Sequence, residues 1–490
     1  MLALAETLEK ERISHAVETS ANHKEVLGQY FTPYPIARFM SSLFPATDKK
    51  IKLLDPGAGI GTLSCSFMER ILKEKWNTPD IHISAYDIDK DVYNTLNENI
   101  ASSSSAFKKA DYEIFSEDFL EKTSFEYTWK INETYTHVIM NPPYKKILTN
   151  SKERQSARAF GLETVNLYSA FMGAAISLTE DNGYIVAIVP RSFCNGVYYK
   201  PFREFILKNC AIKHIHLFES RDSAFKDEAV LQENIIIMLQ KNAEQQNVKI
   251  SYCNDDSFEG LSEFDVHFNQ ILHENDSEKY FHIPTKQQAG SENLTVYSNL
   301  KDLGVKVSTG PIVDFRMKNL LLKDYSANSV PLIYSVHLKN HCLSWPQESK
   351  KPNAIQVSEE VQKQLFPKGF YVLVKRFSTK EETKRVVASL IKPSDFVTDF
   401  ITIENHLNVF HNNKATLEED IAYGLICWLN STYIDEKFRL FSGHTQVNAT
   451  DLRNLPYPSV EELSELGKKI KLEKQWNQIL FDELSEEVTK

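Results

Sequence analysis

Between residues 28 and 245, short apolar runs of the kind that form buried strands alternate with stretches of helical character. Strand, helix and strand in regular succession predict a mostly parallel sheet with helices on both faces, the doubly wound α/β class. The last two apolar runs follow each other without a long helix, which predicts an antiparallel pair at an edge of this sheet. The expected strands are 51–54, 81–85, 112–115, 137–140, 184–189, 214–217 and 234–238, and the expected helices are 62–75, 90–100, 168–179 and 199–209.

The alternation fades after residue 245, and this change divides the chain. A polar run at 241–247 precedes a region of short strand-like pieces, polar turns and aromatic residues. Both ends of the chain have helical character, and in the C-terminal one acidic side chains precede lysines, as helical ion pairing favours. We expect an N-terminal helical arm at 1–25, an α/β domain at 26–245, a second, α+β domain at 246–460 and a C-terminal helix at 461–490.

Composition narrows the class of protein without indicating a function. The 490 residues are 42% hydrophobic and 25% charged, which is typical of globular chains. The six cysteines are scattered and form no CxxC pair, so we expect no metal site and a reducing compartment. The longest apolar run is 421–429, whereas a membrane-spanning helix needs about 20 residues. No secretory signal is visible at the start, and the sequence predicts a soluble, cytoplasmic protein.

The formal charge of −10 excludes a simple polycation that coats nucleic acid, but two stretches are locally basic. Residues 145–160 hold five basic side chains and one acidic one, and residues 313–385 hold 13 basic and seven acidic ones. Stretches of this kind can hold a polyanion such as DNA. Charge alone leaves solvated surface loops as the alternative.

A glycine-rich turn follows the first expected strand, in the sequence Asp55-Pro-Gly-Ala-Gly-Ile-Gly61. Glycine at 57, 59 and 61 allows a tight bend and a close approach of the backbone to a ligand, and the helix that follows offers free amides. Asp87 ends the second expected strand, where a carboxylate can accept hydrogen bonds from both hydroxyls of a ribose. The turn also fits a purely structural role, and Asp87 also fits a helix cap.

Two further groups follow the next expected strands. After the third, Asp118 can accept a hydrogen bond from an adenine amino group and Phe119 can pack on the ring, although a turn aspartate and a core phenylalanine explain them equally well. After the fourth comes Asn141-Pro-Pro-Tyr144. Its prolines stiffen the loop and leave carbonyls free to accept, Asn141 adds a side-chain acceptor, and Tyr144 adds a π-face. This set can grip a planar amide or an aromatic amine.

These four pieces, in this order, resemble a class I S-adenosylmethionine-dependent methyltransferase. Gly28-Gln-Tyr-Phe-Thr-Pro33, ahead of the glycine turn, resembles the cofactor motif of the gamma-class N6-adenine DNA methyltransferases. The stretches 371–380 and 441–456 resemble the recognition region of restriction–modification methylases of the PstI/BsuBI kind. The resemblance covers most of residues 28–460. It implies site-specific methylation of adenine in double-stranded DNA, S-adenosylmethionine as cofactor, and a separate restriction endonuclease as functional partner of a monomer or weak dimer.

The resemblance also implies a role for each candidate residue. Asn141 and the Pro142 carbonyl accept the two amino hydrogens of the adenine, in a loop that Pro143 stiffens. The extruded base stacks on Tyr144, and Phe225 is the candidate for its other face. The expected cofactor residues are Tyr30, Thr32, Pro33, Asp55, Gly57, Gly59, Asp87, Asp118 and Phe119, and the expected phosphate partners are Lys145, Lys146, Lys375, Arg376, Lys384 and Arg385.

Three alternatives remain open. Methyltransferases that act on RNA or on protein glutamine also carry the Asn-Pro-Pro-Tyr sequence, but they usually lack a long C-terminal region with basic stretches. A DNA-recognition subunit with a degenerate methyltransferase fold would not need the intact groups at Asn141 and Tyr144. Transfer to N4 of cytosine is a close variant, in which serine or aspartate usually replaces the asparagine.

Overall fold

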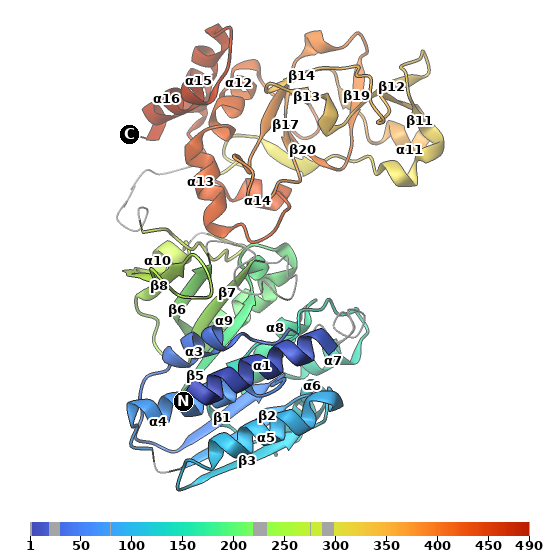
Figure 1. Ribbon diagram of the computed structural model, residues 1–490. Helices are drawn as coiled ribbons and strands as arrows, with labels where there is room; N and C mark the ends of the chain where they lie inside the picture. Colours follow the sequence, from blue (N-terminus) through green and yellow to red (C-terminus); the bar gives the residue numbers. More distant parts are fainter. Residues whose placement is uncertain are drawn as a thin grey trace. The chain divides into compact units, whose positions relative to one another are not determined.

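The computed structural model describes residues 2–18, 30–78, 80–218, 233–274, 276–286 and 298–489. The chain divides into two compact units, residues 1–291 and 292–490. The first is an α/β unit around one large sheet, and the second combines two smaller sheets with helices (Figure 1). Within these described ranges, no helix is long and apolar enough to cross a bilayer.

The first unit is built on a nine-stranded sheet in the order β3-β2-β1-β4-β5-β7-β6-β8-β9. The strands from β3 to β5 are parallel, β7 inserts antiparallel between β5 and β6, β8 lies parallel to β6, and β9 is antiparallel to β8. The order reverses between β1 and β4, and ligands of such sheets bind outside the carboxyl ends of the strands at this switch point. The strands are β1 (Ile51–Pro56), β2 (Ile81–Tyr86), β3 (Ala110–Phe115), β4 (Tyr135–Met140), β5 (Thr179–Pro190), β6 (Cys210–Phe218), β7 (Asn234–Lys241), β8 (Val248–Cys253) and β9 (Ser262–Val266).

Helices cover both faces of this sheet because its central strands are apolar on both sides. In β5, Ile185 and Ala187 belong to the buried cluster that contains α8 and α9, whereas Val186 and Ile188 belong to the cluster that contains α3, α4 and α5. Burial on both faces fixes the sheet as the middle layer of three. The helices are α1 (Leu2–Glu18), α3 (Tyr34–Ser42), α4 (Thr62–Glu74), α5 (Tyr93–Ser104), α6 (Phe119–Trp129), α7 (Lys152–Ala159), α8 (Leu167–Leu178), α9 (Lys200–Asn209) and α10 (Phe268–Ile271).

All seven expected strands form, and the expected α/β class is confirmed. The helix expected at 90–100 begins with a 3-10 turn at Lys90–Val92 and continues as α5. The sequence pattern did not predict α3, α6 or α7. The pair of β6 and β7 is antiparallel as expected, but it does not form an edge, because β8 and β9 continue the sheet beyond β6.

The first unit extends beyond the boundary expected at residue 245 and ends at residue 291. β8 and β9 follow the polar run at 241–247 and join the same sheet, so this run is a surface turn within the unit. The physical reason is backbone pairing, because β6 without β8 would leave a row of donors and acceptors unpaired. The second unit therefore begins at 292 rather than at 246.

The second unit holds a six-stranded sheet in the order β10-β20-β17-β18-β14-β13 and a five-stranded sheet in the order β11-β15-β12-β19-β16. Most neighbouring strands are antiparallel, and a group of helices follows them. Two helices cross closely, since a Cβ on Gly424 of α12 or Gly467 of α15 would overlap the backbone of the other helix. The strands are β10 (Lys306–Thr309), β11 (Leu321–Leu322), β12 (Ser329–Ile333), β13 (Leu338–Lys339), β14 (Cys342–Leu343), β15 (Ala354–Gln356), β16 (Phe366–Pro367), β17 (Tyr371–Lys375), β18 (Ala388–Ile391), β19 (Phe400–Ile403) and β20 (Leu407–His411), and the helices that precede the C-terminal segment are α11 (Glu359–Gln362), α12 (Glu419–Leu429), α13 (Thr432–Phe441) and α14 (Ala449–Arg453).

The two terminal segments differ from the expected ones. α1 occupies Leu2–Glu18 of the arm expected at 1–25. The helix expected at 461–490 is two helices, α15 (Val460–Leu472) and α16 (Gln478–Thr489). Local bonds explain the break, because Glu473 adopts an extended backbone and the indole of Trp476 donates to the carbonyl of Ile470 at 3.2 Å.

Candidate active site

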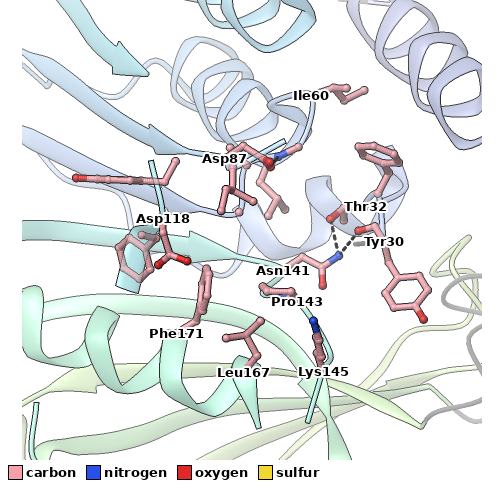
Figure 2. A pocket seen from close by; sticks show the side chains of 18 of the residues that line it. Tyr30, Thr32, Ile60, Asp87, Asp118, Asn141, Pro143, Lys145, Leu167 and Phe171 are labelled. Atoms are coloured by element: carbon pink, nitrogen blue, oxygen red, sulfur yellow. Dashed lines mark hydrogen bonds between the residues drawn. The ribbon is translucent and has the colours of Figure 1, made fainter. Parts of the chain in front are cut away.

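A pocket opens at the carboxyl ends of β1, β2, β3 and β4, beside the switch point of the sheet. The turn after each of these strands contributes to its wall, so that residues far apart in the sequence meet there. The segment 30–32, Glu153 of α7 and helix α8, with Leu167 and Phe171, also line the pocket (Figure 2). The whole lining belongs to the first unit. This is where a doubly wound sheet is expected to bind its ligand.

The glycine turn forms one wall and has the conformation that its sequence predicts. Gly57, Gly59 and Gly61 have φ angles of +79°, +56° and +83°, which side chains with a Cβ rarely adopt. A Cβ on Gly59 would also lie 3.1 Å from the ring of Phe31. The amides of Gly57 and Ala58 both donate to the carbonyl of Tyr86, at 2.8 and 2.9 Å. These bonds fix the turn against β2, and α4 begins directly after it.

Asp87 lies on the neighbouring wall with both carboxylate oxygens engaged. Oδ2 accepts from the amide of Gly59 at 2.7 Å, and Oδ1 accepts from the amide of Asp89 at 2.8 Å. Burial raises the pKa of Asp87 to about 6, in spite of these two donors. Each oxygen has a second lone pair, so the carboxylate can also accept from the hydroxyls of a ribose. Asp87 can therefore bind backbone amides of the protein and the ribose of a ligand at the same time.

Asp55 and Pro33 do not line the pocket, although both were expected to contact the cofactor. Asp55 is fully buried, its Oδ2 accepts from the Ser64 hydroxyl at 2.6 Å, and burial raises its pKa to about 7. It holds α4 against the end of β1. Pro33 precedes α3, where its carbonyl accepts from the amide of Ala37 at 3.0 Å. Both residues support the wall from behind.

Asp118 and Phe119 form the third side of the pocket. Oδ1 of Asp118 accepts from the amide of Glu121 at 2.9 Å and so caps α6, while the residue still lines the pocket. The ring of Phe119 lies 5.1 Å from that of Phe171 and 5.2 Å from that of Tyr86. These rings make an aromatic wall that suits a flat heterocycle.

Asn141 directs its side chain by three hydrogen bonds and is 8% exposed. Its Nδ2 donates to the carbonyl of Tyr30 at 2.9 Å and to Oγ1 of Thr32 at 3.1 Å (Figure 2). Its Oδ1 accepts from the Tyr144 hydroxyl at 2.9 Å, and this hydroxyl also lies 3.1 Å from the carbonyl of Ile188. The structure brings Tyr30, Thr32 and Asn141 together in one pocket, and the sequence did not predict the bonds between the segment 30–32 and Asn141.

The rest of the Asn-Pro-Pro-Tyr loop surrounds this amide. Pro142 is buried and Pro143 lines the pocket. The ring of Tyr144 lies 5.8 Å from that of Tyr30, at 35°, and packs edge-on to Tyr168 at 6.2 Å. Burial raises the pKa of Tyr144 far above its usual value, so its hydroxyl keeps its proton as a donor. Phe225, expected on the other face of the target base, lies outside the described residues.

The expected phosphate partners divide into exposed and buried side chains. Lys145 and Lys146 are exposed directly after the catalytic loop, and Lys145 also lines the pocket. In the second unit, Arg376 and its neighbour Lys375 are half-buried at the end of β17, and Arg376 donates to the carbonyl of Asn405 at 3.1 Å. Lys384 is half-buried and donates to Oγ1 of Thr432 at 3.1 Å.

Arg385 is 2% exposed, which contradicts its expected role at phosphate. Its guanidinium donates to Oγ of Ser378 at 2.9 Å and to the carbonyl of His444 at 2.6 Å, and it lies over the ring of Phe438. Burying an arginine costs free energy that these contacts offset. Arg385 therefore joins separate segments of the second unit, and we assign it no contact with DNA.

The sequence analysis missed several apolar lining residues, which are Phe31, Ala58, Ile60, Leu63, Tyr86, Ile88, Leu167 and Phe171. Ile88 had a signal in the sequence, because it directly follows Asp87 at the end of an expected strand. In the structure this large apolar side chain is 52% exposed. Leu167 and Phe171 had none, because α8 is apolar all round and its pattern predicts only a buried helix. In the described part of the chain, no group of three or more metal-ligating side chains gathers.

This chain is similar to known proteins over most of its length. The family model described as Eco57I restriction-modification methylase matches residues 38–225. Type II methyltransferase M.BsuBI of Bacillus subtilis is 44% identical over 481 residues, which are 96% of this chain and 94% of that protein. Type II methyltransferase M.PstI of Providencia stuartii is 38% identical, over 91% of this chain and 89% of that protein.

Two solved structures share the fold. The cryo-electron microscopy structure of the DrdV–DNA complex has 16% identity and a TM-score of 0.51, over 95% of this chain and 59% of that one. The Type IIL restriction-modification enzyme MmeI, in complex with DNA, has 11% identity and a TM-score of 0.50, over 95% and 68%. The similarity thus extends over most of this chain.

Proposed function

Because this chain belongs to the type II DNA methyltransferases of restriction–modification systems, the family of M.BsuBI and M.PstI, we propose that it methylates N6 of adenine in double-stranded DNA with S-adenosylmethionine. The geometry that carries the choice of an amino group is the Asn141 carboxamide, held so that its oxygen is left as an acceptor. An acceptor beside a cofactor pocket suits a nitrogen nucleophile that carries hydrogens.

The lining of the pocket supports S-adenosylmethionine as the cofactor, because it holds carboxylate acceptors and aromatic rings that suit an adenosine. Asp87 would accept from the ribose hydroxyls, Asp118 would accept from the adenine amino group, and Phe119 would pack on the adenine ring. The methionine end would lie between the glycine turn and Tyr30 and Thr32. When bound, the cofactor supplies an electrophilic methyl group on a sulfonium. The protein supplies the orientation.

The amino group of adenine is a weak nucleophile because its lone pair is delocalised into the ring. Asn141 Oδ1 and the Pro142 carbonyl would accept its two hydrogens and draw the nitrogen toward a tetrahedral geometry. The lone pair would then point along the line of transfer, and the new N–C bond would form as the bond between the methyl carbon and sulfur breaks. The methylated nitrogen would release one proton to solvent water. Positioning and preorganised acceptors supply the rate enhancement in this scheme, without a strong general base.

An adenine in duplex DNA must leave the helix before it reaches this pocket. The Tyr144 ring is proposed to stack on one face of the extruded base, and Phe225 on the other. Lys145, Lys146, Lys375, Arg376 and Lys384 are proposed to contact phosphates, and the second unit is proposed to read the sequence. The methylated site would then resist a separate restriction endonuclease in the same cytoplasm.

The direct test is transfer of labelled methyl from S-adenosylmethionine to unmethylated plasmid DNA, followed by digestion to nucleosides and chromatography. We expect the label in N6-methyladenine. Label in N4-methylcytosine would show a DNA methyltransferase whose target base is cytosine instead of adenine. Label in RNA or protein alone would show that DNA is not the substrate. A chain that does not bind the cofactor at all would act only as a recognition subunit.

A further inference from the structure

We infer that Thr32 is a positioning residue for catalysis: together with the carbonyl of Tyr30, its hydroxyl holds the Asn141 carboxamide in the orientation that offers Oδ1 to the target amino group. The inference deepens the proposed function and rests on it. It also gives the segment 30–32 a second role beside the cofactor, because the same residues line the pocket and hold the catalytic loop.

The orientation of Asn141 follows from the chemistry of its partners. The carbonyl oxygen of Tyr30 can only accept, so the carboxamide group that faces it at 2.9 Å must be Nδ2. The second hydrogen of Nδ2 points at Oγ1 of Thr32, 3.1 Å away. With both hydrogens committed, Oδ1 must point the other way. A flipped carboxamide would set two acceptor oxygens against each other.

Burial makes these bonds hard to replace. Thr32 is 6% exposed and Asn141 is 8% exposed, so water has little access to either group. A buried donor that loses its partner retains the cost of leaving water. Removal of the Thr32 hydroxyl therefore leaves one amide hydrogen without an acceptor, and the Tyr30 carbonyl alone then holds this side of the carboxamide, so that its plane can tilt away from the productive position.

On the other side of the carboxamide, Asn141 Oδ1 can exchange the Tyr144 hydroxyl for a substrate donor. The Tyr144 hydroxyl has one hydrogen and two acceptors, Asn141 Oδ1 at 2.9 Å and the Ile188 carbonyl at 3.1 Å. When a substrate amino group takes Oδ1, the hydroxyl can turn to Ile188 and stay bonded. Oδ1 becomes available without an unsatisfied donor, provided that Thr32 keeps the carboxamide from turning.

A cofactor ligand and a positioning residue predict different kinetics. Loss of a cofactor contact raises the Kd for S-adenosylmethionine and is overcome by more cofactor. Loss of positioning lowers the rate of methyl transfer in the fully bound complex and is not overcome. The conservative serine variant keeps the hydroxyl and so keeps the positioning.

The experiment compares full-length wild type, Thr32→Val and Thr32→Ser. The Kd for S-adenosylmethionine is measured by calorimetry, and the single-turnover methylation rate is measured with both substrates saturating. We expect Thr32→Val to lower the rate at least tenfold and to change the Kd less than threefold, and Thr32→Ser to stay within threefold of wild type in both. Thr32→Ala removes the same hydroxyl and replaces the valine variant if that one does not fold.

Thr179→Val is the matched control, because Thr179 is also buried and its hydroxyl donates to the carbonyl of Ala175 at 2.7 Å, at the amino end of β5. Its rate should equal that of wild type. A wild-type rate in Thr32→Val, or a loss that excess cofactor restores, overturns the inference. Failure of the proposed function is distinguishable, because the wild-type protein would then methylate no DNA. If the wild-type protein methylates cytosine instead of adenine, the comparison of the variants remains valid.

Discussion

At the scale of single residues, Asn141 uses every group of its side chain. Two hydrogens bind the segment before α3, and the oxygen shares the hydroxyl of Tyr144. We expect Asn141→Ala to lower turnover by about 10²–10³-fold, the usual cost of removing one preorganised transition-state contact. The cofactor Kd should change little. Steady-state methylation and calorimetry measure the two effects, and a variant with wild-type turnover would exclude the role of Asn141 as acceptor.

Asp87 governs cofactor affinity in our proposal. Asp87→Ala removes an acceptor of the ribose hydroxyls and of the Gly59 amide, and we expect cofactor affinity to fall about 10- to 100-fold, as for hydrogen bonds to a charged group. Asp111→Ala is the control, since Asp111 lies on β3 with its side chain 77% exposed. A loss of equal size in the control would show that charge alone, and not contact, matters.

The same carboxylate predicts a pH dependence of cofactor binding. Burial raises the pKa of Asp87 to about 6, so it is ionised at pH 7.5 and mostly protonated at pH 5. Protonation removes acceptor capacity, and the Kd should therefore rise as the pH falls through 6. Titration by calorimetry between pH 5 and 8 tests the sign. The Asp87→Ala variant should have lost this dependence.

The sequence indicated residues whose chemistry depends on their near neighbours. The glycine turn, Asp87 and the Asn-Pro-Pro-Tyr loop each follow a recognisable strand, and their side chains lie where that position requires. Asp55 and Arg385 could not be judged in the same way. Their burial depends on partners such as Ser64 and the carbonyl of His444, which only the folded chain brings close.

At the scale of elements, α12 and α15 cross in close backbone contact. A Cβ on Gly467 would overlap the carbonyl oxygen of Asp420, which is backbone and cannot move aside. We expect Gly467→Ala to reduce the free energy of unfolding by about 1–3 kcal/mol, the range for overpacking. Glu465→Ala on the exposed side of α15 is the control. Urea unfolding measures both, and cofactor binding should persist, because the pocket belongs to the first unit.

Elements were predictable where apolar runs are long enough to define a strand. β5 and β7 belong to this class, since both are buried on both faces. β9 was not predicted, because its exposed and half-buried residues alternate at the edge of the sheet. The break between α15 and α16 was also missed, because the bond from Trp476 to Ile470 has no signature in composition.

At the scale of the whole molecule, an acidic protein must bind a polyanion through local charge. Lys145 and Lys146 are exposed beside the pocket, so we expect replacement of both by alanine to weaken duplex binding. The slope of log affinity against log salt should become shallower by about 2, close to one for each phosphate contact. The control replaces Lys49 and Lys50, which are exposed before the amino end of β1 and change the net charge equally. If the salt slopes of the two double variants were equal, Lys145 and Lys146 would not contact DNA phosphates.

The pairing of β8 with β6 determines how the catalytic half could be produced alone. A fragment that stops at residue 245 would present the bare flank of β6, an open template on which strands from other molecules can add and precipitate. A fragment that continues through β9 to residue 286 keeps this flank covered. We therefore expect the fragment that ends at residue 286 to remain in solution and the fragment that ends at residue 245 to aggregate.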